Sequence, residues 1–440
     1  MFLYNLRLAI KSIRRNLSLS VLMVAAIGIG IGACMTVVTV YYMMSGDPIP
    51  HKSDRLFAVQ LNNWEAPGPF DQDRPERLPE LLTYQDAMNL MESDIPTRKL
   101  AMHASGLTLD PANPDINPML TTTLFTTTDF FAMFDLPFQY GGAWDESADS
   151  SAAEVAVISR SLNETVFGGE NSVGERISLD NREFLIIGVL DHWEPVPRFY
   201  SAHNNAFGET DDAFIPLSVN ATWEKQNFGN TNCWGDSPID SYAAFLGSEC
   251  VWIEYWVELD TAAQQDRYLS YLTAYISEQK RLGRFPIADA SAEIHDVNDW
   301  LVYNEVVNPD FRVLLGLAIM FLVVCLINTV ALLLAKFSAN APRVGLRRAL
   351  GASKATIFKQ NLVEVGLIGL GGGMLGLLLA WLGLQGVKAV NLGQYDQLVR
   401  MDQTLVIAAL LVSVVAALIA GLYPTWRICQ VPPATYLKTQ

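Results

Sequence analysis

Two long runs of uncharged residues, separated by a short basic stretch, constrain this chain more than any other feature. The runs cover 313–335 and 365–387, and each contains 23 residues without Asp, Glu, Lys or Arg. A helix needs about 20 such residues to cross the hydrocarbon core of a bilayer. We therefore predict membrane spans over 311–335 and 361–387, joined by a short loop over 336–360.

The loop between these two spans is strongly basic. Glu364 is the only acid beside it, and VGLRRAL stands between Pro342 and Gly351. Its cations are Lys336, Arg343, Arg347, Arg348, Lys354 and Lys359. Loops with this excess of Lys and Arg stay on the cytoplasmic side of a membrane. We predict a short helix after Pro342, ended by Gly351, which offers a basic surface to a soluble partner.

Two more uncharged stretches predict two more spans. Residues 17–45 form a run of 29, long enough to cross the bilayer and extend beyond it as a stalk. Residues 403–426 form the fourth span. The sequence around Cys34 resembles a lipoprotein cleavage box, but the run continues past it, whereas the apolar core of a signal peptide is about 7–15 residues long. We therefore interpret 17–45 as a span that is not cleaved.

Residues 1–16 combine an apolar face with a basic one. The apolar residues recur at helical spacing, and the opposite face carries Arg7, Lys11, Arg14 and Arg15. Such a helix suits the membrane interface, although the same pattern fits the charged flank of the first span. Both interpretations place the N-terminus in the cytoplasm. Four spans then place the tail 427–440 there as well.

Net charge divides the chain into an acidic middle and basic ends. Residues 44–310 contain 15 Lys+Arg and 43 Asp+Glu, a net of −28, whereas the rest has a net of +12. We predict that 46–310 is a large α+β domain outside the cytoplasm, with a loop-rich inserted lobe at about 192–250, and that 388–402 is a short outer loop. Such a domain repels nucleic-acid phosphates, so nucleic acid is excluded as a partner. Its charge either attracts cationic peptides and amines or simply keeps the domain soluble.

Local patterns within the acidic region predict both strands and helices. Alternation and turn signals predict strands over 56–61, 120–125, 155–159, 176–179, 183–190 and 251–259. Helical spacing predicts helices over 84–91, 130–134, 160–167 and 261–281. Asp180–Asn181 is a hairpin turn signal. We expect 297–312 to continue into the second span as a helical stalk, with Pro309 as a kink.

Cysteines and glycines predict close contacts. Cys233 and Cys250 are the only cysteines of the acidic region. They can form a disulfide in an oxidising compartment, worth about 3 kcal/mol in the loop-entropy model, and two buried free thiols are the alternative.

Small residues at helical spacing let spans pack tightly, within one chain or between two copies. These are Gly28 and Gly32 in the first span, and Gly369, Gly373 and Gly376 in the third.

The signatures of common catalytic and metal sites are missing from these residues. The sequence contains no GxxxxGK[ST], HExxH, CxxC or GxSxG. We expect no catalytic residue, no metal and no cofactor in this chain, with ATP and Mg bound by a partner subunit. We interpret His192 and His203 as solvated loop residues rather than metal ligands, and Asp211–Asp212 as a solvated face. We also expect all four spans to lack charges, which argues against a proton-coupled pump.

Several stretches resemble MacB/FtsX-type ABC transporter permeases. The segment after the second span of that family is similar to VGLRRALGASKATIFKQNLVEVGLIGLGGGMLGLLLA. The family's periplasmic domain resembles TTTDFFAMFDLPFQYGGAW, VAVISRSLNETVFGGENSVGERISLDNREFLIIGVL and AFIPLS, and its closing motif resembles GLYPTWRICQVPPATYLK. The resemblance covers both ends of the chain and much of the middle. It implies a basal and a distal lobe in the domain outside the cytoplasm.

The resemblance also gives the basic loop a role. In the family this element is a coupling helix that docks into the ATPase subunit. The corresponding residues here are Arg343, Val344, Gly345, Leu346, Arg347, Arg348, Ala349, Leu350 and Gly351. Arg343 stands where the family has Glu, so one expected contact is absent.

By resemblance, this chain is the permease subunit of a MacB-like exporter of peptides, drugs or other amphiphiles, working by mechanotransmission. The implied partners are a separate ABC ATPase, a second identical or related permease, a periplasmic adaptor (membrane fusion protein), an outer-membrane channel and the lipid bilayer. The implied location is the bacterial inner membrane. The alternative is an FtsX-like regulator that does not transport and instead activates a cell-wall hydrolase. A membrane-anchored enzyme has no motif to support it.

Overall fold

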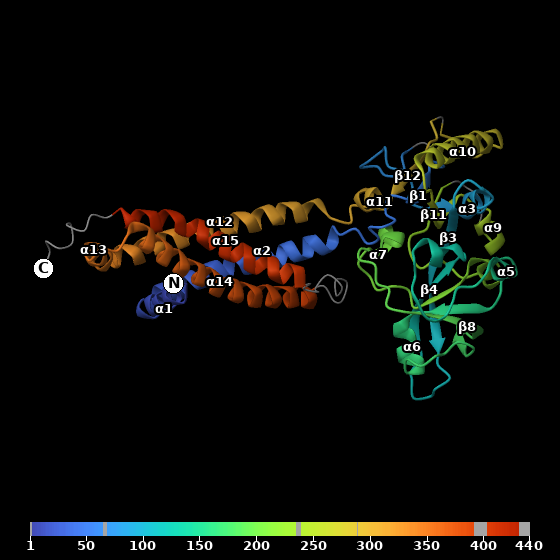
Figure 1. Ribbon diagram of the computed structural model, residues 1–440. Helices are drawn as coiled ribbons and strands as arrows, with labels where there is room; N and C mark the ends of the chain where they lie inside the picture. The colour runs from blue at the N-terminus through green and yellow to red at the C-terminus, as the bar shows by residue number, and fades with distance from the viewer. Residues whose placement is uncertain (1, 65–67, 235–238, 288, 391–402, 431–440) are drawn as a thin grey trace. The chain divides into compact units, whose positions relative to one another are not determined.

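The computed structural model describes residues 2–64, 68–234, 239–287, 289–390 and 403–430. The chain divides into two compact units (Figure 1). We call Met1–Ser45 with Val307–Gln440 the helical unit, and Gly46–Val306 the α/β domain. Each is described separately.

Within the described residues, the helical unit contains four helices long and apolar enough to cross a membrane. They are α2 (Leu17–Met44), α12 (Pro309–Ala339), α14 (Lys354–Val390) and α15 (Gln403–Cys429). Two shorter helices accompany them, α1 (Phe2–Arg15) and α13 (Ala341–Ala349). Figure 1 shows the long helices side by side, with α13 at one end. The predicted four-span architecture is therefore confirmed; 391–402 of the expected outer loop and 431–440 of the tail lie outside the described residues.

Glycines let the long helices approach closely, and they do so within one chain. A Cβ on Gly32 would lie 2.7 Å from Leu379 Cβ, and one on Gly376 would lie 3.2 Å from the Gly28 backbone oxygen, so these glycines form the seam between α2 and α14. Gly369 and Gly373 line a second seam, against Ser413 of α15. Small residues on two faces of α14 therefore hold it between its neighbours.

The α/β domain is built on a 12-stranded sheet, whose main order is β12-β1-β11-β3-β4-β9-β6-β8-β5. The strands are β1 (Leu56–Leu61), β2 (Leu82–Thr83), β3 (Arg98–Asp110), β4 (Met119–Thr126), β5 (Phe138–Gly141), β6 (Val155–Ile158), β7 (Arg176–Leu179), β8 (Arg182–Leu190), β9 (Ala213–Pro216), β10 (Asn232–Cys233), β11 (Cys250–Glu258) and β12 (Ala292–Asp296). β4 pairs with β9 and β6 with β8 in parallel, and the other pairs are antiparallel.

Short helices connect these strands. They are α3 (Tyr84–Leu90), α4 (Asp129–Met133), α5 (Glu146–Ser150), α6 (Arg160–Phe167), α7 (Ala202–Asn205), α8 (Asn220–Trp223), α9 (Tyr242–Leu246), α10 (Ala262–Arg281) and α11 (Val297–Tyr303). Two 3-10 turns are η1 (Phe199–Ser201) and η2 (Leu217–Val219). The predicted strands and helices all occur, and Asp180 and Asn181 form the β7–β8 turn with positive φ.

The prediction of a continuous stalk over 297–312 is wrong. α11 ends at Tyr303, and α12 begins at Pro309 after a break in which Glu305 has a φ of 50°. Proline has no N–H to donate, which costs nothing in the first turn of a helix. Pro309 therefore starts α12 rather than bending it.

The loop-rich stretch 192–250 is part of the sheet. Its strand β9 is fully buried and lies between β4 and β6. At its end Cys233 and Cys250 form a disulfide in the structure, with an S–S distance of 2.01 Å, between the paired strands β10 and β11. The sequence did not predict β9, because its four residues end in a proline.

Two ionisable residues that we expected to be solvated are buried. Asp211 is fully buried, with its Oδ2 3.0 Å from the Tyr200 hydroxyl and 3.4 Å from Arg198 Nη2. The His203 side chain is only 9% exposed, and its Nε2 lies 3.3 Å from Glu254 Oε1. The solvated interpretation of Asp211 and His203 is therefore wrong, whereas the His192 side chain is 62% exposed. The mixed loops fold back onto β11 and bring these groups inside.

Burial sets the protonation of the His203–Glu254 contact. Burial raises the pKa of Glu254 from 4.5 to about 8, partly offset by a hydrogen bond from Ser201 Oγ at 2.8 Å. Burial also lowers the pKa of His203 to about 4. Near neutral pH the proton therefore stays on Glu254 and the imidazole is uncharged.

We expect Glu254→Gln to stabilise the α/β domain increasingly as the pH rises. The folded pKa of Glu254 lies above the unfolded value of 4.5, so wild-type stability is lost between about pH 4.5 and pH 8, by at most about 1.4 kcal/mol per pH unit. Glutamine does not titrate. Thermal unfolding of the full chain in detergent, at several pH values, should show a difference between variant and wild type that grows with pH. The exposed Glu183→Gln on β8 is the control, and a difference for Glu254→Gln that is independent of pH contradicts the account.

Candidate functional site

The basic stretch between the second and third spans folds as predicted into a short helix. Pro342 lies in the first turn of α13, where a missing N–H is not needed. Gly351 follows the helix with a φ of 98°, a conformation that suits glycine and ends the helix. Ser353 Oγ then accepts a hydrogen bond from Thr356 N at 3.1 Å, which caps the start of α14. Proline, glycine and serine thus set the length of α13.

One side of α13 faces away from the bundle. Leu346 is 52% exposed and Leu350 is 79% exposed, and Arg343 and Ala349 are exposed beside them. Neighbouring exposed apolar side chains mark a surface suited to contact with another protein. This outward patch of Leu346, Ala349 and Leu350 is the part of the predicted coupling segment that a partner can reach.

The other side of α13 is fastened to the spans. Gly345 is buried, and Val344 packs against the core of the helical unit. Arg347 Nη1 donates to Gln360 Oε1 of α14 at 2.6 Å, and Arg348 Nη1 donates to the Cys429 backbone oxygen of α15 at 3.3 Å. The segment therefore has a bound face and a free face, and its two adjacent arginines belong to the bound one.

Beneath α13 lies a buried ion pair. Lys336 Nζ of α12 is 2.6 Å from Glu364 Oε1 of α14, with side chains 0% and 3% exposed. Lys336 also donates to Ser20 Oγ of α2 at 2.8 Å, and Ser12 Oγ of α1 donates to Glu364 Oε1 at 2.9 Å. Four helices therefore meet at one pair of opposite charges.

This pair corrects the expectation that the spans carry no charge. Helices α12 and α14 extend beyond the uncharged runs, and Lys336 and Glu364 lie inside the candidate membrane helices. The sequence analysis missed the pair because both residues lie just outside the uncharged runs. Lys336 follows the run 313–335, and Glu364 precedes the run 365–387. Opposite charges at the joined ends of two successive spans are the signal that could have found it.

The segments at which the chain enters and leaves the α/β domain are bound to each other. Asp47 Oδ2 accepts hydrogen bonds from Ser53 Oγ at 2.7 Å and from Asn298 Nδ2 at 3.1 Å. The Val297 backbone N–H donates to the Ser53 backbone carbonyl oxygen at 3.2 Å. Next to them, β1 pairs with the edge strand β12. Both connections to the spans therefore belong to one edge of the sheet.

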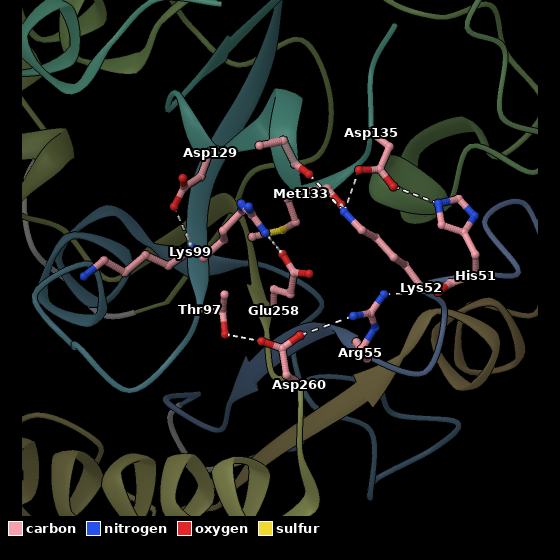
Figure 2. Close-up of polar contacts among 12 residues, drawn as sticks. His51, Lys52, Arg55, Thr97, Lys99, Asp129, Met133, Asp135, Glu258 and Asp260 are labelled. Carbon is pink, nitrogen blue, oxygen red and sulfur yellow. Dashed lines mark hydrogen bonds and ion pairs between the residues drawn. The ribbon is translucent and has the colours of Figure 1, made fainter.

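A network of ion pairs ties the first of these segments into the domain (Figure 2). Lys52 Nζ and His51 Nε2 lie 2.6 Å and 2.7 Å from the Asp135 carboxylate, just after α4. Burial raises the pKa of Asp135, but hydrogen bonds from Lys52 and His51 outweigh it and hold the pKa below its usual value. Arg55 reaches Asp260 at 3.4 Å, beyond the end of β11. Sequence reasoning did not identify this network, since its members are scattered along the chain.

Four candidate membrane helices with a large α/β domain between the first and second define a polytopic membrane protein of permease architecture. A family model of the MacB-like periplasmic core domain matches residues 20–274, and a model of the FtsX-like permease C-terminal region matches residues 315–433. The first match covers more than half of the chain. The chain therefore belongs to the MacB/FtsX-type family of ABC transporter permeases.

Individual relatives agree with this assignment. The macrolide export ATP-binding/permease protein MacB of Rhodospirillum rubrum is 23% identical, over 99% of this chain and 60% of that protein. The MacB protein of Shewanella sp. (strain W3-18-1) is 24% identical, over 71% of this chain and 42% of that protein. The chain thus spans about half the length of the curated relatives it matches. The solved periplasmic region of MacB from Actinobacillus actinomycetemcomitans is 14% identical, over 57% of this chain and 92% of that one, with a TM-score of 0.36.

We expect Glu364→Gln to destabilise the helical unit by roughly 3–5 kcal/mol, because it leaves the buried Lys336 charge unpaired. The double variant Lys336→Met with Glu364→Leu removes both charges and should recover most of that loss. Thermal unfolding of the full chain in detergent measures both. If the single and double variants lose equal stability, the ion pair does not organise the four helices.

Proposed function

We propose that this chain is the permease subunit of a MacB-like ABC exporter that works by mechanotransmission, with ATP and Mg bound by a separate ATPase subunit. The observation that carries the proposal is the two-sided structure of α13. Its outward patch exposes Leu346 and Leu350, while Arg347 and Arg348 fasten the same helix to α14 and α15. A helix of this kind can take a push from a partner and pass it to the spans.

The orientation in the membrane follows from charge. The end of the helical unit that carries α1 and α13 holds most of the Lys and Arg outside 44–310, which favours the cytoplasm. The acidic α/β domain then lies in the periplasm, and both termini lie in the cytoplasm. ATP binding in the cytoplasm would thereby act on a domain in the periplasm.

The α/β domain is suited to receive such a motion. Its two connections are joined through Asp47 and Asn298 and by the pairing of β1 with β12. Since both spans act on one edge of a single sheet, displacement of α2 and α12 moves that edge as a unit.

A second permease, identical or related, an adaptor and an outer-membrane channel complete the proposed machine. Peptides, drugs or other amphiphiles are the proposed cargo; the MacB relatives are named macrolide export proteins.

The alternative is an FtsX-like regulator of a cell-wall hydrolase, which shares the membrane region matched at 315–433. The match of 20–274 to the MacB-like core domain favours the exporter. Affinity isolation from membranes distinguishes the two, because an adaptor bound to the α/β domain supports export and a hydrolase supports regulation.

We expect Leu350→Asp to weaken binding of the partner ABC ATPase by about 30-fold, as for loss of an interface hot spot. The charge would be placed at the centre of the outward patch. Binding and ATP turnover of the co-expressed complex in detergent are the measurements. The control is Leu120→Asp on β4, a leucine that is 69% exposed in the α/β domain. Unchanged binding by Leu350→Asp removes the coupling role from α13.

A further inference from the structure

A basic cavity lies at the end of the helical unit where α13 is found. Its volume is about 170 Å³, and residues of α1, α12, α13, α14 and α15 line it. Four of the lining side chains are cations: Lys11, Arg15, Arg343 and Arg347. Helices that are far apart in the sequence therefore place four positive charges around one small space.

The residues that the structure describes do not neutralise these charges. Glu364 is the only carboxylate in the lining, and it is paired with Lys336 at 2.6 Å. Arg15 donates to Asn340 Oδ1, and Arg347 donates to Gln360 Oε1 at 2.6 Å; both acceptors are neutral amides. Lys11 and Arg343 form no ion pair with any residue that the structure describes.

Glu364 is also the only acid among the described residues outside 44–310. Four like charges around one cavity repel one another, and a bound anion relieves that repulsion. The described residues supply no carboxylate for this purpose apart from the paired Glu364.

The position of the cavity indicates which anion. α12 and α14 are candidate membrane spans, and the cavity lies where α13 joins them. Basic pockets between spans near the cytoplasmic surface of a membrane attract acidic lipids. Arginine forks match phosphate oxygens, while Asn361 and Ser12 offer further polar groups and Leu8 and Ile357 offer apolar ones. A phosphate on a glycerol ester has this combination of charge, polarity and apolar surface.

We propose that this cavity binds the phosphate headgroup of an anionic phospholipid. The bound phosphate bridges Lys11 and Arg15 of α1 to Arg343 and Arg347 of α13. The bound phosphate thereby holds α1 against α13. Arg343, the residue at which this chain departs from its family, supplies one of the four charges. The inference stands on the helical unit alone and does not depend on export or on an ATPase.

The test compares three probes on the full chain in detergent by native mass spectrometry. The probes are dioctanoyl phosphatidylglycerol, dioctanoyl phosphatidylcholine and inorganic phosphate. We expect the anionic lipid to bind at least tenfold more tightly than the zwitterionic lipid. Equal binding of the two lipids overturns the proposal. Binding of inorganic phosphate as tight as that of phosphatidylglycerol also overturns it, because the ligand is then a free anion.

Matched variants locate the site. The double variant Arg15→Gln with Arg343→Gln removes two lining cations. It should weaken phosphatidylglycerol binding by about 30-fold, which is the combined contribution expected of two cations near an anionic membrane surface. The control is Arg14→Gln with Lys359→Gln, which removes two exposed cations outside the cavity, one on α1 and one on α14. We expect the control to change affinity less than threefold. An equal loss in both overturns the proposal, since the attraction is then a general effect of charge.

A single variant covers the case in which the double variant fails to fold. Lys11→Gln disturbs no hydrogen bond or ion pair of the described structure. It should weaken phosphatidylglycerol binding by about fivefold. Full retention of affinity by Lys11→Gln, together with equal affinity for the two lipids, overturns the assignment without recourse to the double variant.

Discussion

The buried pair of Lys336 and Glu364 is the interaction on which the helical unit depends. A charge removed from water is costly unless an opposite charge and further hydrogen bonds surround it. Here Ser12 and Ser20 complete the shell, so that α1, α2, α12 and α14 must all be present for either charge to be satisfied. Apolar packing and glycine seams also bring the spans together. The pair adds a contact that is satisfied only when these four helices are aligned as they are here.

The rest of the architecture can be understood from that fixed point. The pair lies directly below α13, and the bonds of Arg347 and Arg348 to α14 and α15 make α13 part of the same block. The basic cavity lies above the pair and uses cations that the pair does not neutralise. At the other ends of α2 and α12, the chain continues into segments joined by Asp47, Ser53 and Asn298. The helical unit is thus joined by the Lys336–Glu364 pair, and the α/β domain is joined by hydrogen bonds between its first and last segments.

The sequence predicted the parts of this structure that rest on local physics. Uncharged runs identified the four spans, and alternation gave β1 with the bounds that the structure shows. The sequence failed where tertiary partners decide the outcome. β3 was missed because its Lys99, His103 and Gly106 interrupt the apolar pattern, and its pairing with β4 and β11 holds it extended instead.

The same limit applies to the candidate site. The bounds of α13 follow from Pro342 and Gly351, which act locally. Which of its arginines are fastened and which are free depends on Gln360 and Cys429, and no local pattern reports on those partners. The burial of His203 and Asp211 was unpredictable for a similar reason, since residues in a polar loop are placed inside only by the strand they fold against.

Opposite placement of the α/β domain and α13 across the bilayer is the central claim, and cysteine labelling tests it most directly. Leu120→Cys and Leu350→Cys each introduce a thiol at a residue that is 69% or 79% exposed, while Cys34, Cys325 and Cys429 are buried. A membrane-impermeant maleimide is applied to intact and to permeabilised spheroplasts. The account predicts that Leu120→Cys reacts in intact spheroplasts and Leu350→Cys only after permeabilisation. Reaction of Leu350→Cys in intact spheroplasts would contradict it.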